Sequence, residues 1–167
     1  MAVARAPLIL ASASPRRVDL LAQIGITPDL VIAPDIDEAP LKGELPRAYA
    51  RRLAHAKLEA AARPGAFALA ADTVVAAGRR ILPKPGTAEE ARRCLDLLSG
   101  RRHRVLTAVV LLGPDGRRSE RLCDSIVAFA RLTPQQVIGY VETGEWEGKA
   151  GGYAIQGHAA AFIRFLT

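Results

Sequence analysis

The feature that most limits the fold of this 167-residue chain is a pair of long apolar segments joined by a tight-turn signal. Residues 102–112 and 121–132 are rich in β-branched and apolar residues, and Gly113-Pro114-Asp115-Gly116 lies between them. Clusters of glycine, proline and aspartate are typical of turns between strands. The pattern therefore predicts a long hairpin.

Helix and strand patterns follow one another without strict alternation along the rest of the chain. Together with the hairpin, this favours an α/β or α+β fold with a mixed sheet, in one domain or in two small lobes that share a core. Helices are expected from Pro15 to Gly25, 46–63, 87–98 and 134–144, and further strands at 8–11, 30–33, 67–76, 81–82 and 161–165.

The charge and the cysteines limit the class of partner and the compartment. A net charge of +6 admits nucleic acid, an acidic membrane surface or a phosphorylated small molecule, although an arginine-rich composition also explains it. Aromatic residues make up only 5% of the chain, too few to favour a surface on which nucleic-acid bases stack. No apolar run is long enough to span a membrane. Cys94 and Cys123 lack zinc-site spacing, so we expect buried, reduced thiols in a cytoplasmic protein.

The segment Ser14-Pro15-Arg16-Arg17 follows a buried strand and starts a helix. Ser14 suits the N-cap and Pro15 suits the first helical position. The backbone N–H groups and the helix dipole there attract anions, and two arginines add groups that can bind phosphate bidentately. A solvated helix with surface arginines is the alternative interpretation of this segment.

Three further segments carry candidate site residues. Asp72 interrupts the apolar run 70–75, where a carboxylate is costly unless it is paired, binds a metal or faces a cleft; capping of a bulge is the alternative. Lys84 lies between two prolines and could contact phosphate or simply be exposed. The glycine-rich segment 144–157 permits close approach of a ligand, with Gln156 able to pair with a base edge, or is a flexible surface loop.

Acidic residues at 35, 37 and 38 precede a helix that carries Lys57. Two sources of carboxylates combined with arginine and lysine form a sensible site for a divalent metal and a triphosphate. The three histidines show no constellation, and neither a P-loop nor a nucleophile-elbow motif occurs.

Five motifs occur in an order that resembles the Maf family, nucleoside triphosphate pyrophosphatases first named as septum-formation inhibitors. They span nearly the whole chain, and we expect one Maf-like domain over residues 1–167. The motifs are Leu-Ala-Ser-x-Ser-Pro-Arg-Arg at 10–17, Ala-Asp-Thr-Val-Val at 71–75, Lys-Pro at 84–85, Leu-Ser-Gly-x-x-His-x-Val at 98–105 and Gly-Lys-Ala-Gly-Gly-Tyr-x-Ile-Gln-Gly at 148–157.

The resemblance implies metal-dependent hydrolysis of a nucleoside triphosphate to its monophosphate and pyrophosphate, with Mg²⁺ or Mn²⁺. It implies an α/β fold whose mixed central sheet is flanked by helices, two-lobed with a cleft, like the inosine triphosphate pyrophosphatases. It implies Asp72 as the general base, and Glu38 with Asp72 as metal ligands. The residues it implies as phosphate contacts are Ser12, Ser14, Arg16, Arg17, Lys57 and Lys84.

Arg16, Thr73 and Gln156 match the subgroup that acts on dTTP and UTP rather than on 7-methyl-GTP. The resemblance therefore implies a cytoplasmic, homodimeric enzyme that removes dTTP, UTP and modified pyrimidine nucleotides from the nucleotide pool, with no membrane or nucleic-acid partner. The alternative is a non-catalytic protein that binds nucleotide or nucleic acid and acts on cell division. Family members continue beyond the position of Thr167, so the resemblance implies that this C-terminal family segment is absent here.

Overall fold

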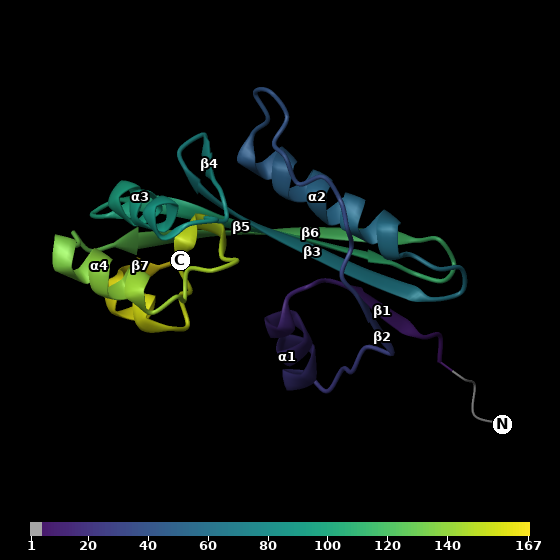
Figure 1. The fold of residues 1–167 in the computed structure, drawn as a ribbon. Coiled ribbons are helices and arrows are strands. Elements are labelled where there is room, and N and C mark those ends of the chain that lie inside the picture. Colours follow the sequence, from purple (N-terminus) through teal and green to yellow (C-terminus); the bar gives the residue numbers. More distant parts are fainter. Residues whose placement is uncertain (1–4) are drawn as a thin grey trace. The chain divides into compact units, whose positions relative to one another are not determined.

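The computed structural model describes residues 5–167, which form helices and a mixed β-sheet (Figure 1). Within these residues the sheet has seven strands in the order β2-β1-β3-β5-β6-β7, and β4 pairs with β3. β1 runs parallel to β2 and β3, whereas β4 and β7 run antiparallel to β3 and β6. The prediction of a mixed central sheet flanked by helices is confirmed.

Most elements lie where the sequence patterns predict them. The helices are α1 (Pro15–Gln23), α2 (Pro46–Ala61), α3 (Ala88–Leu98) and α4 (Pro134–Glu142), with 3₁₀ turns η1 (Ala150–Gly152) and η2 (His158–Phe162). The strands are β1 (Leu8–Ala11), β2 (Leu30–Ile32), β3 (Phe67–Ala77), β4 (Arg80–Leu82), β5 (Arg102–Leu112), β6 (Arg118–Phe129) and β7 (Ile163–Leu166). None of these helices is both long and apolar enough to cross a membrane.

The contacts within the chain divide it into two compact units. The first unit comprises the chain up to Glu44, Ala48–Asp72 and Thr107–Leu122, and the second comprises Leu45–Arg47, Thr73–Leu106 and Cys123–Thr167. The cleft between two lobes stays a prediction.

Alanine dominates the core of the first unit. The buried face of α2 repeats at helical spacing and carries Ala50, Leu53, Ala54, Leu58 and Ala61. Ala68 and Ala70 of β3 are also fully buried, and α2 lies along the face of this strand in Figure 1. Small side chains on both elements let the helix approach the strand closely.

The core of the second unit is aromatic. Phe129 of β6 contacts Tyr153 and Phe162 edge to face, with ring centroids 4.9 and 6.2 Å apart. Phe162 in turn contacts Tyr140 of α4. α4 begins with a capping box, in which the Thr133 hydroxyl accepts from the backbone of Gln136 and the Gln136 side chain accepts from the backbone of Thr133. These contacts fix α4 beside the glycine-rich segment that follows it.

The predicted bounds of the second hairpin strand were wrong by three residues at each end. The turn closes at once, because Gly113 donates to the Arg117 carbonyl, and pairing begins at Arg118. The strand starts with charged residues that a search for apolar runs misses. Arg118 pairs with Glu59 of α2, and Glu120 pairs with Arg51.

Two further predictions need correction. Cys94 is buried, but Cys123 is exposed because β6 buries only part of its length. Ser14 occupies the N-cap of α1, but its side chain forms no capping hydrogen bond. Instead, the backbone N–H of Ser14 donates to the Ser12 hydroxyl, 3.1 Å away.

Candidate active site

A buried lysine joins two of the predicted acidic residues in the first unit. The Lys57 Nζ of α2 lies 2.7 Å from Glu38 Oε1 and also donates a hydrogen bond to Asp72 Oδ1. Lys57 retains 7% of its exposure and Asp72 retains 4%. The structure therefore brings Glu38, Lys57 and Asp72 together, from the acidic loop, a helix and a strand.

Lys57 and Asp72 are buried because each occupies a position on the apolar face or in the buried run of its element. Lys57 occupies the apolar face of α2, and Asp72 lies within β3 between the buried residues Ala71 and Val74. A buried charge is costly unless it is paired, and removing one partner of a buried pair is strongly destabilising. Each group thus depends on the other, and Asp72 meets the predicted requirement that a carboxylate at this position be paired.

α2 also fixes the backbone of the acidic loop. The Tyr49 hydroxyl donates to the Glu38 carbonyl at 2.6 Å, and the Arg52 guanidinium donates to the Ala39 carbonyl at 2.9 Å. Arg52 further binds both carboxylate oxygens of Glu44, at 2.7 and 2.8 Å. Burial, reinforced by the negative charges of Asp72 and Glu38, raises the pKa of Tyr49. Its phenol therefore stays a neutral hydrogen-bond donor that holds Glu38 in place.

Sequence reasoning missed Tyr49 and Arg52 as supports of this loop. Both lie on α2 upstream of Lys57, and the acidic loop directly precedes that helix. Polar side chains on the first turns of the helix could therefore have been predicted to hydrogen-bond the loop. Among the predicted loop carboxylates, Asp37 accepts from the Ala39 backbone N–H at 2.8 Å. That contact gives Asp37 a role in shaping the turn.

The predicted phosphate loop lies between β1 and α1 in the same unit. The buried Ser12 hydroxyl accepts from the backbone of Ser14 and from Arg17 Nη1, the latter 3.0 Å away. The Ser12 backbone N–H donates to Ile32 of the neighbouring strand at 2.8 Å. This network holds the Arg17 guanidinium against the loop, while Arg16 is exposed.

The electrostatics of Arg17 connect the loop to the carboxylates. Burial is the main cause that lowers the pKa of Arg17, and the charge of Arg16 acts in the same direction. The charges of Asp72 and Glu38 oppose it by favouring the guanidinium cation. The Arg17 guanidinium therefore lies within electrostatic reach of both Asp72 and Glu38.

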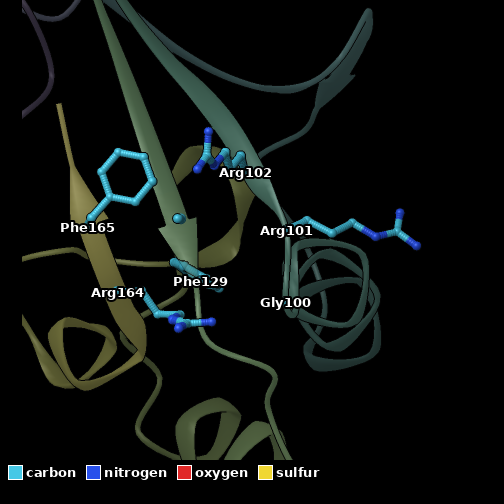
Figure 2. Close-up of a pocket in the computed structure, with 7 residues that line it drawn as sticks. Gly100, Arg101, Arg102, Phe129, Arg164 and Phe165 are labelled. Carbon is cyan, nitrogen blue, oxygen red and sulfur yellow. The ribbon is translucent and has the colours of Figure 1, made fainter.

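The remaining predicted residues belong to the second unit. Thr73 follows Asp72 in β3, Lys84 is exposed between Pro83 and the buried Pro85, and Gln156 is exposed after η1. Their roles stay predictions. A hollow of about 370 Å³ in this unit is lined by none of these three residues. Arg102 and Arg164 lie beside it, and Arg101 points away (Figure 2).

A family model described as Maf-like protein matches residues 7–167. The chain belongs to the Maf family. A Granulibacter bethesdensis protein named dTTP/UTP pyrophosphatase is 58% identical, over 96% of this chain and 83% of that protein. A Paramagnetospirillum magneticum protein of the same name is 60% identical, over 95% and 85%. Among solved structures, the Staphylococcus aureus Ham1 protein matches 74% of this chain and 72% of its own, with a TM-score of 0.49 and 16% identity.

The carboxylates of this Maf family chain form a donor set that can be compared with the needs of a divalent metal. No cluster of three or more histidine, cysteine or acidic residues that could hold a metal occurs in the part of the chain that the structure describes. Glu38 and Asp72 nevertheless converge on one ammonium group, so their oxygens are close enough to share a cation. Mg²⁺ typically binds through one or two carboxylates together with substrate phosphates, which matches this donor set.

Proposed function

We propose that this chain hydrolyses dTTP and UTP to the nucleoside monophosphate and pyrophosphate. The contact of buried Lys57 with Glu38 and Asp72, beside the Ser12–Arg17 loop, carries the proposal. The names of the relatives support it, since proteins about 60% identical to this chain are named dTTP/UTP pyrophosphatase. A cytoplasmic location and a homodimer stay predictions.

Asp72 acts as the general base in this proposal. A water molecule attacks the α-phosphorus, and Asp72 takes its proton. A bond forms between the water oxygen and the α-phosphorus, and the bond from that phosphorus to the oxygen bridging to the β-phosphorus breaks. Pyrophosphate then leaves with that oxygen. A positioned carboxylate contributes about 10²- to 10⁴-fold in rate as a general base.

The cations of the first unit bind the phosphates. Arg17 is fixed by the Ser12 hydroxyl, so its guanidinium needs little reordering when a phosphate arrives. Arg16 is exposed on the next position of the helix and adds a second group of the same kind. Lys57 pairs with the two carboxylates, and its positive charge also stabilises the leaving pyrophosphate. Lys84, Thr73 and Gln156 keep the roles that the family resemblance implies.

Glu38 and Asp72 would hold the divalent metal, Mg²⁺ or Mn²⁺. When bound, such an ion neutralises phosphate charge and makes the phosphorus easier to attack. Tyr49 and Arg52 keep the Glu38 backbone in position for this role through their bonds to Glu38 and Ala39.

Release of pyrophosphate from dTTP, UTP, CTP, dGTP, ITP and 7-methyl-GTP, with Mg²⁺ or Mn²⁺, tests the proposal. We expect release mainly from dTTP and UTP, and a loss of about 10²- to 10⁴-fold in kcat for Asp72→Asn. Nucleotide binding by this variant, measured by calorimetry, should persist. Asp96→Asn, on the exposed side of α3, is the matched control and should keep full activity.

Near-normal turnover by Asp72→Asn would remove this residue from the role of base. Release mainly from 7-methyl-GTP would contradict the choice of substrate but leave a pyrophosphatase. Binding without release from any nucleotide would favour the non-catalytic alternative.

A further inference from the structure

His103 of β5 is buried in the second unit and keeps one hydrogen bond. Its Nε2 lies 2.7 Å from the Tyr153 hydroxyl, while Nδ1 has no partner among the described residues. The ring also packs edge to face on Phe129, with centroids 5.1 Å apart. A phenylalanine would fill this space without leaving a buried nitrogen unsatisfied. The imidazole is therefore explained by its bond to Tyr153 rather than by packing.

Tyr153 belongs to the glycine-rich loop 148–157, which carries Gln156. Further bonds hold this loop on both sides of Gln156. The Ala154 N–H donates to the Tyr140 hydroxyl at 2.9 Å, and the His158 N–H donates to Glu145 at 2.8 Å. Between these anchors Ile155 packs against the core of the unit and Gln156 is exposed, so the backbone position of Gln156 depends on them.

The same loop is joined to the segment that carries Lys84. The Gly151 N–H donates to the Pro83 carbonyl at 3.0 Å. Gly152, with a φ of +73°, packs so closely that an added Cβ would lie 3.2 Å from Pro85. Two motif segments, at 84–85 and 148–157, thus form one packed assembly within the second unit.

We propose that His103 is a positioning residue that, through Tyr153, fixes the 148–157 loop so that Gln156 reads the pyrimidine base. This inference rests on the proposed function, because the nucleotide it positions is the one proposed above. It gives a role to the histidine of the Leu-Ser-Gly-x-x-His-x-Val motif. His103 contacts neither Gln156 nor substrate in this scheme, and it acts only through the loop.

Tyr153→Phe and His103→Phe test the inference, since both keep aromatic packing and remove the bond. Hydrogen exchange of the amides at 154–157 should become faster in both variants, independently of any activity. For turnover, we expect KM for dTTP and UTP to rise and their selectivity over CTP to fall by about tenfold, with kcat nearly unchanged. The double variant should lose no more than either single one, because both remove the same bond.

Phe162→Leu is the matched control, because it loosens the aromatic packing on Phe129 and Tyr140 but removes no hydrogen-bonding group of the loop. It should lower the melting temperature and leave the base selectivity unchanged. Tyr153→Phe removes a single oxygen, so it decides the matter should His103→Phe fail to fold.

The outcomes separate this inference from the proposed function. Unchanged exchange at 154–157, or faster exchange with wild-type selectivity, would overturn the positioning role. Loss of selectivity in Phe162→Leu to the same extent would also overturn it. If the wild type hydrolyses neither dTTP nor UTP, the proposed function fails, and the inference that Gln156 reads a pyrimidine fails with it. The hydrogen-exchange data then still report whether the His103–Tyr153 bond fixes the loop.

Discussion

Replacing His103 by phenylalanine should remove an acid-sensitive part of the stability of this chain. Burial lowers the pKa of His103 from 6.5 to about 4, so the folded protein keeps the imidazole neutral. In the unfolded chain the ring takes up a proton near its usual pKa of 6.5. Between these two values the unfolded state binds more protons, and the free energy of unfolding therefore falls as the pH falls.

The separation of the two pKa values corresponds to about 3 kcal/mol. This contribution is fully present above pH 6.5 and is lost by about pH 4. His103→Phe cannot take up the proton, so its free energy of unfolding should fall by about 3 kcal/mol less than that of the wild type between pH 7 and pH 4. Other acidic groups titrate in the same range, but they are common to both proteins and cancel in the difference.

Urea unfolding followed by far-ultraviolet circular dichroism at several pH values measures this difference. Tyr153→Phe is the control, because it keeps the buried imidazole and should retain most of the acid-sensitive loss. The reasoning is refuted if His103→Phe loses as much stability as the wild type across this range.

Two further predictions concern the candidate site and the glycine loop. Lys57→Met leaves its two carboxylates without their cation and should lower the free energy of unfolding, measured with urea, by about 3–5 kcal/mol. The control Arg92→Met, on the exposed face of α3, should lower it by at most about 0.5 kcal/mol. Equal losses in the two variants would contradict the buried ion pair. Gly151→Ala, whose Cβ would lie 2.8 Å from Val75, should lower the melting temperature more than Gly148→Ala, which has a similar positive φ and nothing within 4 Å. Equal shifts in calorimetry would mean that backbone strain alone, and not the close packing of the loop, sets the cost.

The sequence predicts those elements whose local pattern and tertiary environment agree. β5 lies at the predicted residues because an apolar run ends at Gly113, and α1 starts at Pro15 because proline suits that position. The start of β6 is missed because its charged residues are stabilised by ion pairs with α2, for example Arg118 with Glu59. Such pairs join residues far apart in the chain, and no local pattern contains them.

The candidate site shows the same limit. Motif resemblance selected Glu38, Lys57 and Asp72, but nothing in their spacing requires one lysine to contact both carboxylates. That contact exists because α2 lies along β3. His103 looks isolated in the sequence because its partner Tyr153 is 50 residues away. The chemical roles of the site residues stay predictions until turnover is measured.

The alanines buried between α2 and β3 have a consequence for any mutational scan of this chain. A larger side chain at Ala54 or Ala70 would overpack the interface, and such insertions typically cost about 1–3 kcal/mol. They would also move the helix that carries Lys57 away from Asp72. In a selection for activity, these scaffold positions should tolerate as few residue types as the site itself. A map of intolerant positions would therefore not separate chemistry from support here, and stability has to be measured beside turnover.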